Sequence, residues 1–219
     1  MSSGRHRGPH PAEVREVRRT DLGAVARTFG AAFAEDPVWR WLISGDRRTS
    51  TRIGGALAGV AEMYRRHGTC WMTPDERAVA VWAPPGRDRV GLRQFLPAAP
   101  RFLRAMGPTG ISRLGAMTEL EREHPRQPCW YLAAVGTDPA HRGKGLGAAL
   151  LTPALARADR AGVGAYLEAT REENLPFYER FGFRLTSTFD LARGSGPRLW
   201  LMWREPQPPT AEPRASVAP

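Results

Sequence analysis

The chain has 219 residues, near the length of one domain with extensions, and its 42% hydrophobic residues suffice for a sizeable core. Its formal net charge is +10, but the 32 Lys and Arg residues are spread along the chain and follow no zinc-finger, RRM or basic-zipper pattern. We therefore expect no nucleic-acid partner. No apolar run reaches the ~18 residues that a membrane-spanning helix needs, so no membrane partner is expected either.

Composition also divides the chain into three parts. Residues 1–12 are rich in Pro, Gly and Ser and lack the apolar stretch of a secretory signal, so we expect a flexible leader there. Residues 206–219 are Pro-rich and are expected to form a flexible tail, which leaves residues 13–205 as one folded domain. The two cysteines, Cys70 and Cys129, make neither a disulfide framework nor a zinc set. Buried thiols, no bound metal and a cytoplasmic location follow as expectations.

The first half of the chain shows strand and helix periodicities in turn. Thr20 or Asp21 is expected to cap the first helix, in which apolar residues recur at helical spacing from Leu22 to Phe33. The predicted elements are a strand at residues 13–19, a helix that Pro37 ends, a helix at 47–68, strands at 69–73 and 78–85, and two short helices within 86–128 that Gly107 and Pro108 separate.

In the second half, strand and helix patterns alternate more clearly. The predicted elements are strands at residues 130–137, 163–170, 183–191 and 197–205, and helices at 146–162 and 174–182. Strands that alternate with helices and then pair with one another indicate an α/β fold with a mixed central sheet.

A glycine-rich segment lies between the first strand and the first helix of this half. In RGKGLG, residues 142–147, three glycines alternate with other residues and two of those are cations. Glycines before a helix are typical of phosphate binding, because amide groups with no neighbouring Cβ approach an anion closely. A Walker A loop is not predicted, since the Gly-Lys pair is followed by Gly145 instead of Ser or Thr. A dinucleotide fingerprint is disfavoured by the GxGxG spacing and by its late position in the chain.

The same segment reads R-x-x-G-x-G, and here the sequence resembles the GNAT family of acetyl-CoA-dependent N-acetyltransferases. The resemblance implies a GNAT fold, in which the mixed sheet is splayed open between the fourth and fifth strands and is flanked by helices. It also implies acetyl-CoA as the co-substrate, with its pyrophosphate at the N-terminus of the helix that begins near Leu146. Arg142 and Lys144 would add positive charge at that place.

A second motif, NLPFYERFGF at residues 174–183, supports the same family. Asn174 is expected as the N-cap of its helix and Gly182 as the C-terminal stop. In the family a tyrosine at this position points toward the CoA sulfur, so the resemblance implies that Tyr178 protonates the leaving thiolate. The family's usual asparagine lies seven residues before the tyrosine, where this chain has Arg171.

The resemblance also places pantetheine along a bulge in the fourth strand. Gly136 supports this placement, because glycine within a strand is unfavourable unless a bulge or a close approach requires it. The residues expected to bind the cofactor are Val135, Gly136, Thr137, Arg142, Gly143, Lys144, Gly145, Leu146, Gly147 and Asn174.

Amide formation also requires that the acceptor amine lose a proton. Glu168, on the predicted fifth strand, is expected to be the base, and His124, just before the fourth strand, is the other candidate. The structural alternatives are a solvated surface carboxylate and an ordinary loop histidine. An acceptor whose amine has a low pKa would need no base.

The acceptor is expected near AEDPVWRW, residues 34–41, where two acids precede two tryptophans. Acids beside aromatic faces suit a cationic amine, although the tryptophans could equally cover the core. The residues expected to bind the acceptor are Asp36, Trp39, His124 and Tyr131.

Together these features predict an enzyme that transfers an acetyl group to the primary amine of a small molecule, such as an antibiotic, in a ternary complex. We expect a monomer or a homodimer. Within the enzyme class, the alternative is a protein lysine or N-terminal acetyltransferase. A peptide acceptor needs an open groove, so the helices of residues 86–123 would exclude one if they fold over the cleft. Outside that class, the alternative is an acyl-CoA-binding module, against which the presence of Tyr178 argues.

Overall fold

The computed structural model describes residues 13–43, 47–87 and 95–208. The predicted leader, and residues 209–219 of the predicted tail, lie outside the described residues.

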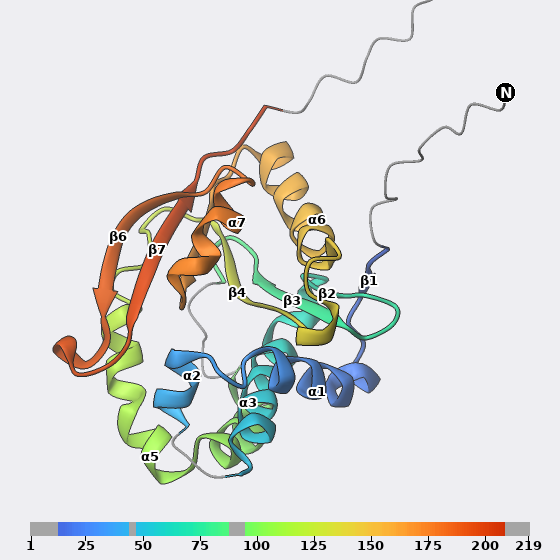
Figure 1. Cartoon of the computed structure of the whole chain (residues 1–219). Coiled ribbons are helices and arrows are strands. Elements are labelled where there is room, and N and C mark those ends of the chain that lie inside the picture. Colours follow the sequence, from blue (N-terminus) through green and yellow to red (C-terminus); the bar gives the residue numbers. More distant parts are fainter. Residues whose placement is uncertain (1–12, 44–46, 88–94, 209–219) are drawn as a thin grey trace, which may run out of the picture.

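A seven-stranded mixed sheet runs through the molecule in the order β1-β2-β3-β4-β5-β7-β6 (Figure 1). Neighbouring strands are antiparallel except β4 and β5, which are parallel. The strands are β1 Arg15–Glu16, β2 Cys70–Met72, β3 Ala78–Ala83, β4 Trp130–Thr137, β5 Ala165–Ala169, β6 Arg184–Asp190 and β7 Arg198–Arg204. The α/β class and the mixed sheet are confirmed.

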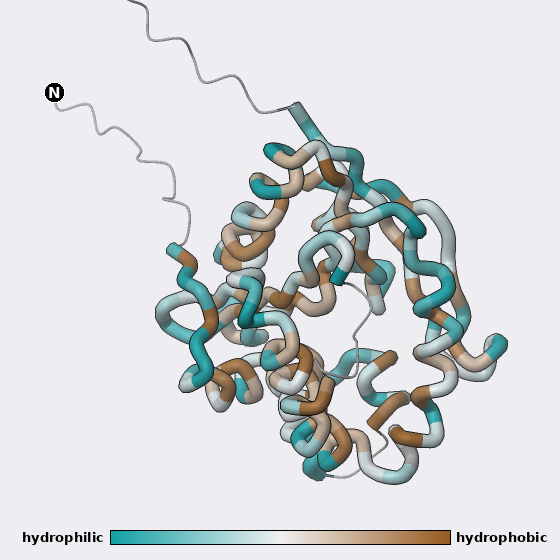
Figure 2. Tube along the Cα trace, turned by 180° about the vertical axis from the view of Figure 1, so that it is seen from behind, coloured by the Kyte–Doolittle hydropathy of each residue, from teal (hydrophilic) through white to brown (hydrophobic). Residues whose placement is uncertain are grey.

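Helices pack on both faces of this sheet (Figure 1). They are α1 Leu22–Ala32, α2 Pro37–Leu42, α3 Thr49–Tyr64, α5 Ala99–Leu120, α6 Leu146–Ala161 and α7 Leu175–Glu179. The apolar sides of α1, α2, α3 and α5 share one buried core, and those of α6 and α7 share another on the opposite face. Hydrophobic and hydrophilic stretches accordingly alternate along the helices (Figure 2). No helix of the described chain is both long and apolar enough to cross a membrane.

An extra residue in β4 changes the direction of its side chains halfway along the strand. Val81 of β3 is paired with Ala134 and Trp82 with Leu132, so that Ala133 is bulged. Leu132 therefore packs in the core beside α6, whereas Ala134 packs in the core beside α1 and α3.

Beyond this point β4 and β5 separate. Their parallel pairing covers only Trp130 with Ala165 and Tyr131 with Tyr166, although β4 continues to Thr137 and β5 to Ala169. The sheet is thus splayed between its fourth and fifth strands, which confirms the expected GNAT architecture.

Two predicted details were wrong. The first helix ends at Ala32, well before Pro37, and Pro37 instead begins α2, where a residue without an N–H is favoured. The first strand is only two residues long. Asp21 is at the N-cap of the first helix, as predicted, but its carboxylate accepts from the backbone N–H of Arg18 and makes no cap hydrogen bond to this helix. By contrast, the predicted break in α5 is present, since Gly107 has φ 63° and ψ −176° between two helical parts.

Candidate active site

A cleft of about 990 Å³ opens where β4 and β5 diverge. Its walls come from four places in the chain: the end of α1 with the α1–α2 loop, β4, the loop that leads into α6, and the end of β5 with α7. Most of the predicted site residues line it: Asp36, Trp39, Val135, Gly136, Thr137, Arg142, Gly143, Gly145, Leu146, Gly147, Glu168, Asn174 and Tyr178. Lys144, His124 and Tyr131 are not among the described residues that line it.

The glycine-rich loop adopts a backbone that only glycine forms without strain. Gly143 and Gly145 both have φ of +77°, in the left-handed region, and a Cβ on either would meet no atom within 4 Å. Conformation, not crowding, therefore explains these two glycines. The first helical bond of α6 runs from the N–H of Ala149 to the carbonyl of Gly145, which leaves the preceding N–H groups available to an anion.

The two cations of this loop differ in position. Arg142 donates from Nη2 to the carbonyl of Ala32 at 3.1 Å and so ties the loop to the end of α1. Lys144 is exposed. Of the two, only Arg142 lies on the wall of the cleft in this structure.

The other two glycines of the site are explained by close packing. A Cβ on Gly147 would lie 3.2 Å from Cζ of Phe177, so this glycine lets α6 approach α7. A Cβ on Gly136 would lie 2.8 Å from the Cβ of Ala32 and 3.0 Å from the ring of Phe29. The bulge is at Ala133 instead, so Gly136 serves the close approach of α1 and not a bulge.

Tyr178 lies on α7 with its ring packed against Phe177 and Phe183, at centroid distances of 5.2 and 6.2 Å. The residue is 8% exposed and lines the cleft. Burial raises the pKa of its phenol well above the ordinary value, and the negative charge of Asp36 raises it further. Tyr178 is therefore protonated throughout the neutral range.

Asn174 is at the N-cap position of α7, as predicted, but its side chain does not cap the helix. A 3-10 turn, Glu172–Asn174, precedes α7, so Asn174 already has helical dihedral angles and its side chain accepts no cap hydrogen bond. The predicted N-cap position is confirmed without its side-chain hydrogen bond, and Asn174 lines the cleft.

Glu168, on the wall of the cleft, is in direct contact with His124, which lies behind it. Nε2 of His124 lies 2.7 Å from Oε1 of Glu168, and the two side chains are only 7% and 5% exposed. Oε1 has no aligned hydrogen-bond donor among the described residues, so this close contact lacks the geometry of a linear hydrogen bond. Two tyrosine rings enclose the histidine, Tyr131 at 4.7 Å and Tyr166 at 5.1 Å between centroids.

The negative charge of Glu168 raises the pKa of both tyrosines. Burial raises the pKa of Tyr131, and the charge of Glu168 with a hydrogen bond to its carboxylate raises it further. Burial and then the same charge raise the pKa of Tyr166. Tyr131 therefore belongs to the buried surroundings of Glu168, where the sequence had suggested contact with the acceptor.

The carboxylate of Asp36 is already hydrogen-bonded within the protein. Its Oδ1 accepts from the backbone N–H groups of Val38 and Trp39 at 3.0 Å each, which caps α2, and its Oδ2 accepts from the hydroxyl of Thr170. Burial raises the pKa of this carboxyl against the opposing effect of those hydrogen bonds. Trp41, the second predicted tryptophan, stacks under the guanidinium of Arg113 at 4.9 Å.

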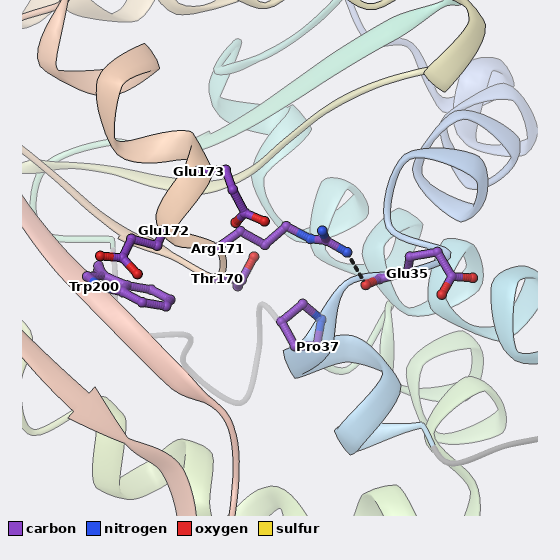
Figure 3. Close-up of a pocket in the computed structure, with 7 residues that line it drawn as sticks. All are labelled: Glu35, Pro37, Thr170, Arg171, Glu172, Glu173 and Trp200. Carbon is purple, nitrogen blue, oxygen red and sulfur yellow. Dashed lines mark hydrogen bonds between the residues drawn. The ribbon is translucent and has the colours of Figure 1, made fainter.

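A second cavity of about 620 Å³ adjoins the cleft, because the two share the lining residues Glu35, Thr170, Arg171 and Glu173. Figure 3 shows the residues that line this second cavity. The side chain of Arg171 crosses it and donates to the backbone carbonyl of Glu35. Glu172 and Trp200 form its far wall. Arg171 and Trp200 were not predicted as site residues; the sequence signal for Arg171 was its position seven residues before Tyr178, where the family usually has asparagine.

The comparisons with known proteins agree with this geometry. Residues 104–183 match the model of the acetyltransferase (GNAT) family. An uncharacterized N-acetyltransferase of Schizosaccharomyces pombe is 34% identical, over 94% of this chain and 90% of its own length.

Solved structures show the same fold. A histone acetyltransferase HPA2 and related acetyltransferase of Corynebacterium glutamicum is 26% identical with a TM-score of 0.62, over 90% of this chain and 97% of that one. Arylalkylamine N-acetyltransferase 2 of Aedes aegypti has a TM-score of 0.63 at 12% identity, over 89% of this chain and 99% of that one. With the splayed sheet, the glycine-rich loop and the buried tyrosine in one cleft, these likenesses identify the chain as a GNAT-family N-acetyltransferase.

Proposed function

We propose that this enzyme transfers the acetyl group of acetyl-CoA directly to the primary amine of a small molecule, while both substrates are bound. The observation that carries the proposal is that one cleft contains the glycine-rich loop, an unpaired stretch of β4 and the phenol of Tyr178. These are the parts needed to hold a diphosphate, an extended pantetheine and a leaving thiolate.

The residues present fit acetyl-CoA. The N–H groups at the start of α6 and the side chain of Arg142 would hold the diphosphate. Val135, Gly136 and Thr137 lie where β4 has no partner in β5, so their backbone groups on that edge would pair with pantetheine. When bound, acetyl-CoA supplies an activated carbonyl and a thiolate leaving group.

The chain would contribute proton transfers and charge stabilisation. Glu168 lines the cleft and would accept the proton of the ammonium, which frees the amine to attack the thioester carbonyl. A backbone N–H of β4 aimed at the developing oxyanion would lower the barrier by about 3 kcal/mol. Tyr178 would give its proton to the departing sulfur, because its raised pKa keeps the phenol protonated at neutral pH.

The small-molecule acceptor is supported by a resemblance to puromycin N-acetyltransferase, which is strong over residues 128–183 and weak over residues 40–72 and 86–123. The weak segments are where the acceptor would be bound. An antibiotic amine is accordingly the first acceptor to test, and such an enzyme would confer resistance.

One observation favours the second candidate, a protein acetyltransferase. No residue of α5 is among the described residues that line the cleft, because α5 packs against α3 and the β6–β7 turn. The cover that the sequence suggested for excluding a peptide is thus not provided by this helix.

A thiol-release assay with acetyl-CoA separates the candidates. The panel is puromycin, aminoglycosides, a lysine peptide and a peptide with a free N-terminus. The proposal predicts turnover with a small amine and little with either peptide. Turnover with peptides only would assign the second function, and CoA binding without turnover would indicate a binding module.

A further inference from the structure

Glu168 and His124 entered the sequence analysis as rival candidates for one role, but the structure places them in contact. Nε2 and Oε1 are 2.7 Å apart, within a pocket that leaves each side chain less than a tenth exposed. Glu168 comes from β5 and His124 from the segment between α5 and β4, so two separate parts of the chain build this pair.

The pair reaches the cleft at one end only. Glu168 lines the cleft, whereas His124 lies behind it between the rings of Tyr131 and Tyr166. Because Oε1 has no aligned hydrogen-bond donor among the described residues, the carboxylate is not fully satisfied by the fold. A buried carboxylate in this state gains most from a proton or a cation that arrives through the cleft.

Further titratable groups lie near the two tyrosines of the pair. The titratable groups that act on its two tyrosines are Tyr64 on α3, Cys129 before β4, and Glu123 beside His124. His124, which contacts Glu168, can itself carry a positive charge.

We infer that His124 and Glu168 act as one proton-accepting unit for the acceptor amine, with Glu168 as the catalytic residue and His124 as the positioning residue behind it. This inference rests on the proposed function. Glu168 would take one proton from the ammonium and share it with Nε2 of His124, and the pair would release it to solvent after turnover. The second N–H proton of the amine replaces the one that Tyr178 gives to sulfur, so the reaction yields amide, thiol and one free proton.

The pH dependence of kcat/KM tests the role of Glu168. The wild type, Glu168→Gln and His124→Gln are compared in the thiol-release assay with the best acceptor of the panel. The range is the two pH units below the pKa of its amine, about 10.4 for an alkylamine or 7.7–8.0 for an α-amine. Without the base, only the free amine reacts, so kcat/KM of Glu168→Gln should rise about 100-fold across this range. The wild type should change less than about threefold, because its base removes the proton.

The double variant tests the pair as a unit. His124→Gln should lower kcat with little change in KM, and adding it to Glu168→Gln should lower kcat no further. Glu121→Gln, an exposed carboxamide substitution close to His124 in sequence, is the matched control and should behave as the wild type.

Parallel pH profiles for the wild type and Glu168→Gln, or losses that add in the double variant, would overturn the inference. Calorimetry with CoA shows whether each variant is folded. If Glu168→Gln fails to bind CoA, the predicted fall in kcat of His124→Gln is the remaining test, and an unchanged kcat would overturn the inference. Failure of the proposed function would look different, since the wild type itself would then acetylate no small-molecule amine.

Discussion

Replacing Tyr178 with Phe removes the proposed acid and little else. The hydroxyl is lost, while the ring contacts with Phe177 and Phe183 are retained. Tyr178 is 8% exposed, and burial and the charge of Asp36 raise its pKa. The phenol therefore stays protonated at neutral pH and can donate to the sulfur. General acid catalysis of this kind contributes about 10²- to 10⁴-fold. We therefore expect kcat to fall by about 10²-fold or more, which corresponds to at least ~2.7 kcal/mol in the barrier.

The assay follows thiol release with saturating acetyl-CoA and the best acceptor, beside calorimetric titration with CoA. The dissociation constant of CoA should change less than about threefold, because the phenyl ring keeps the shape of the wall. Tyr64→Phe is the control, since Tyr64 is a buried tyrosine that does not line the cleft. A Tyr178→Phe enzyme that turns over like the wild type would refute the assigned role, and so would an equal loss in Tyr64→Phe.

Two further substitutions test the loop and the fold. Gly145→Ala places a Cβ on a backbone with φ +77°, so both the affinity for CoA and the stability should fall, the stability by about 1–2 kcal/mol. Gly162→Ala is the control at the other end of α6, where φ is +63°. It should lose similar stability but keep the affinity for CoA, as measured by calorimetry. Hydrogen bonds from Arg204, at 2.7 and 2.8 Å, hold the pKa of Asp159 below its usual value against burial, which raises it. This stabilisation is present above the unfolded pKa and is lost as pH falls through the folded one, so Asp159→Asn should weaken the loss of stability in acid. At pH 7 it should lower the unfolding free energy by about 3–5 kcal/mol, because Arg204 is only 3% exposed. The exposed Asp190→Asn is its control, and equal losses of Tm in the two variants would contradict the burial argument.

Elements with local signals could be predicted closely from the sequence. Gly145 and Gly162 delimit α6 in the structure as they do in the sequence, and both have positive φ. The segment of residues 130–137 was predicted as a strand and forms β4 over the same residues. Here the backbone requirement and the residue type are encoded at one position, so no distant contact is needed to interpret them.

Features that depend on distant contacts could not be predicted. Asp36 lies beside another acid and two tryptophans, a pattern typical of a cation-binding site. Its carboxylate instead caps α2 and accepts from the hydroxyl of Thr170, which directly follows β5. Gly136 was interpreted from its strand alone, whereas the close approach of Ala32 explains it. The contact between His124 and Glu168 likewise depends on how the segment after α5 folds against β5.

A crystal structure of the enzyme with CoA tests the central claim most directly, namely that the cleft between β4 and β5 is the cofactor site. The account predicts the diphosphate against the N–H groups of residues 143–148, pantetheine along β4 from Val135 to Thr137, and the sulfur beside the hydroxyl of Tyr178. CoA bound outside this cleft, or with its sulfur directed away from Tyr178, would contradict it.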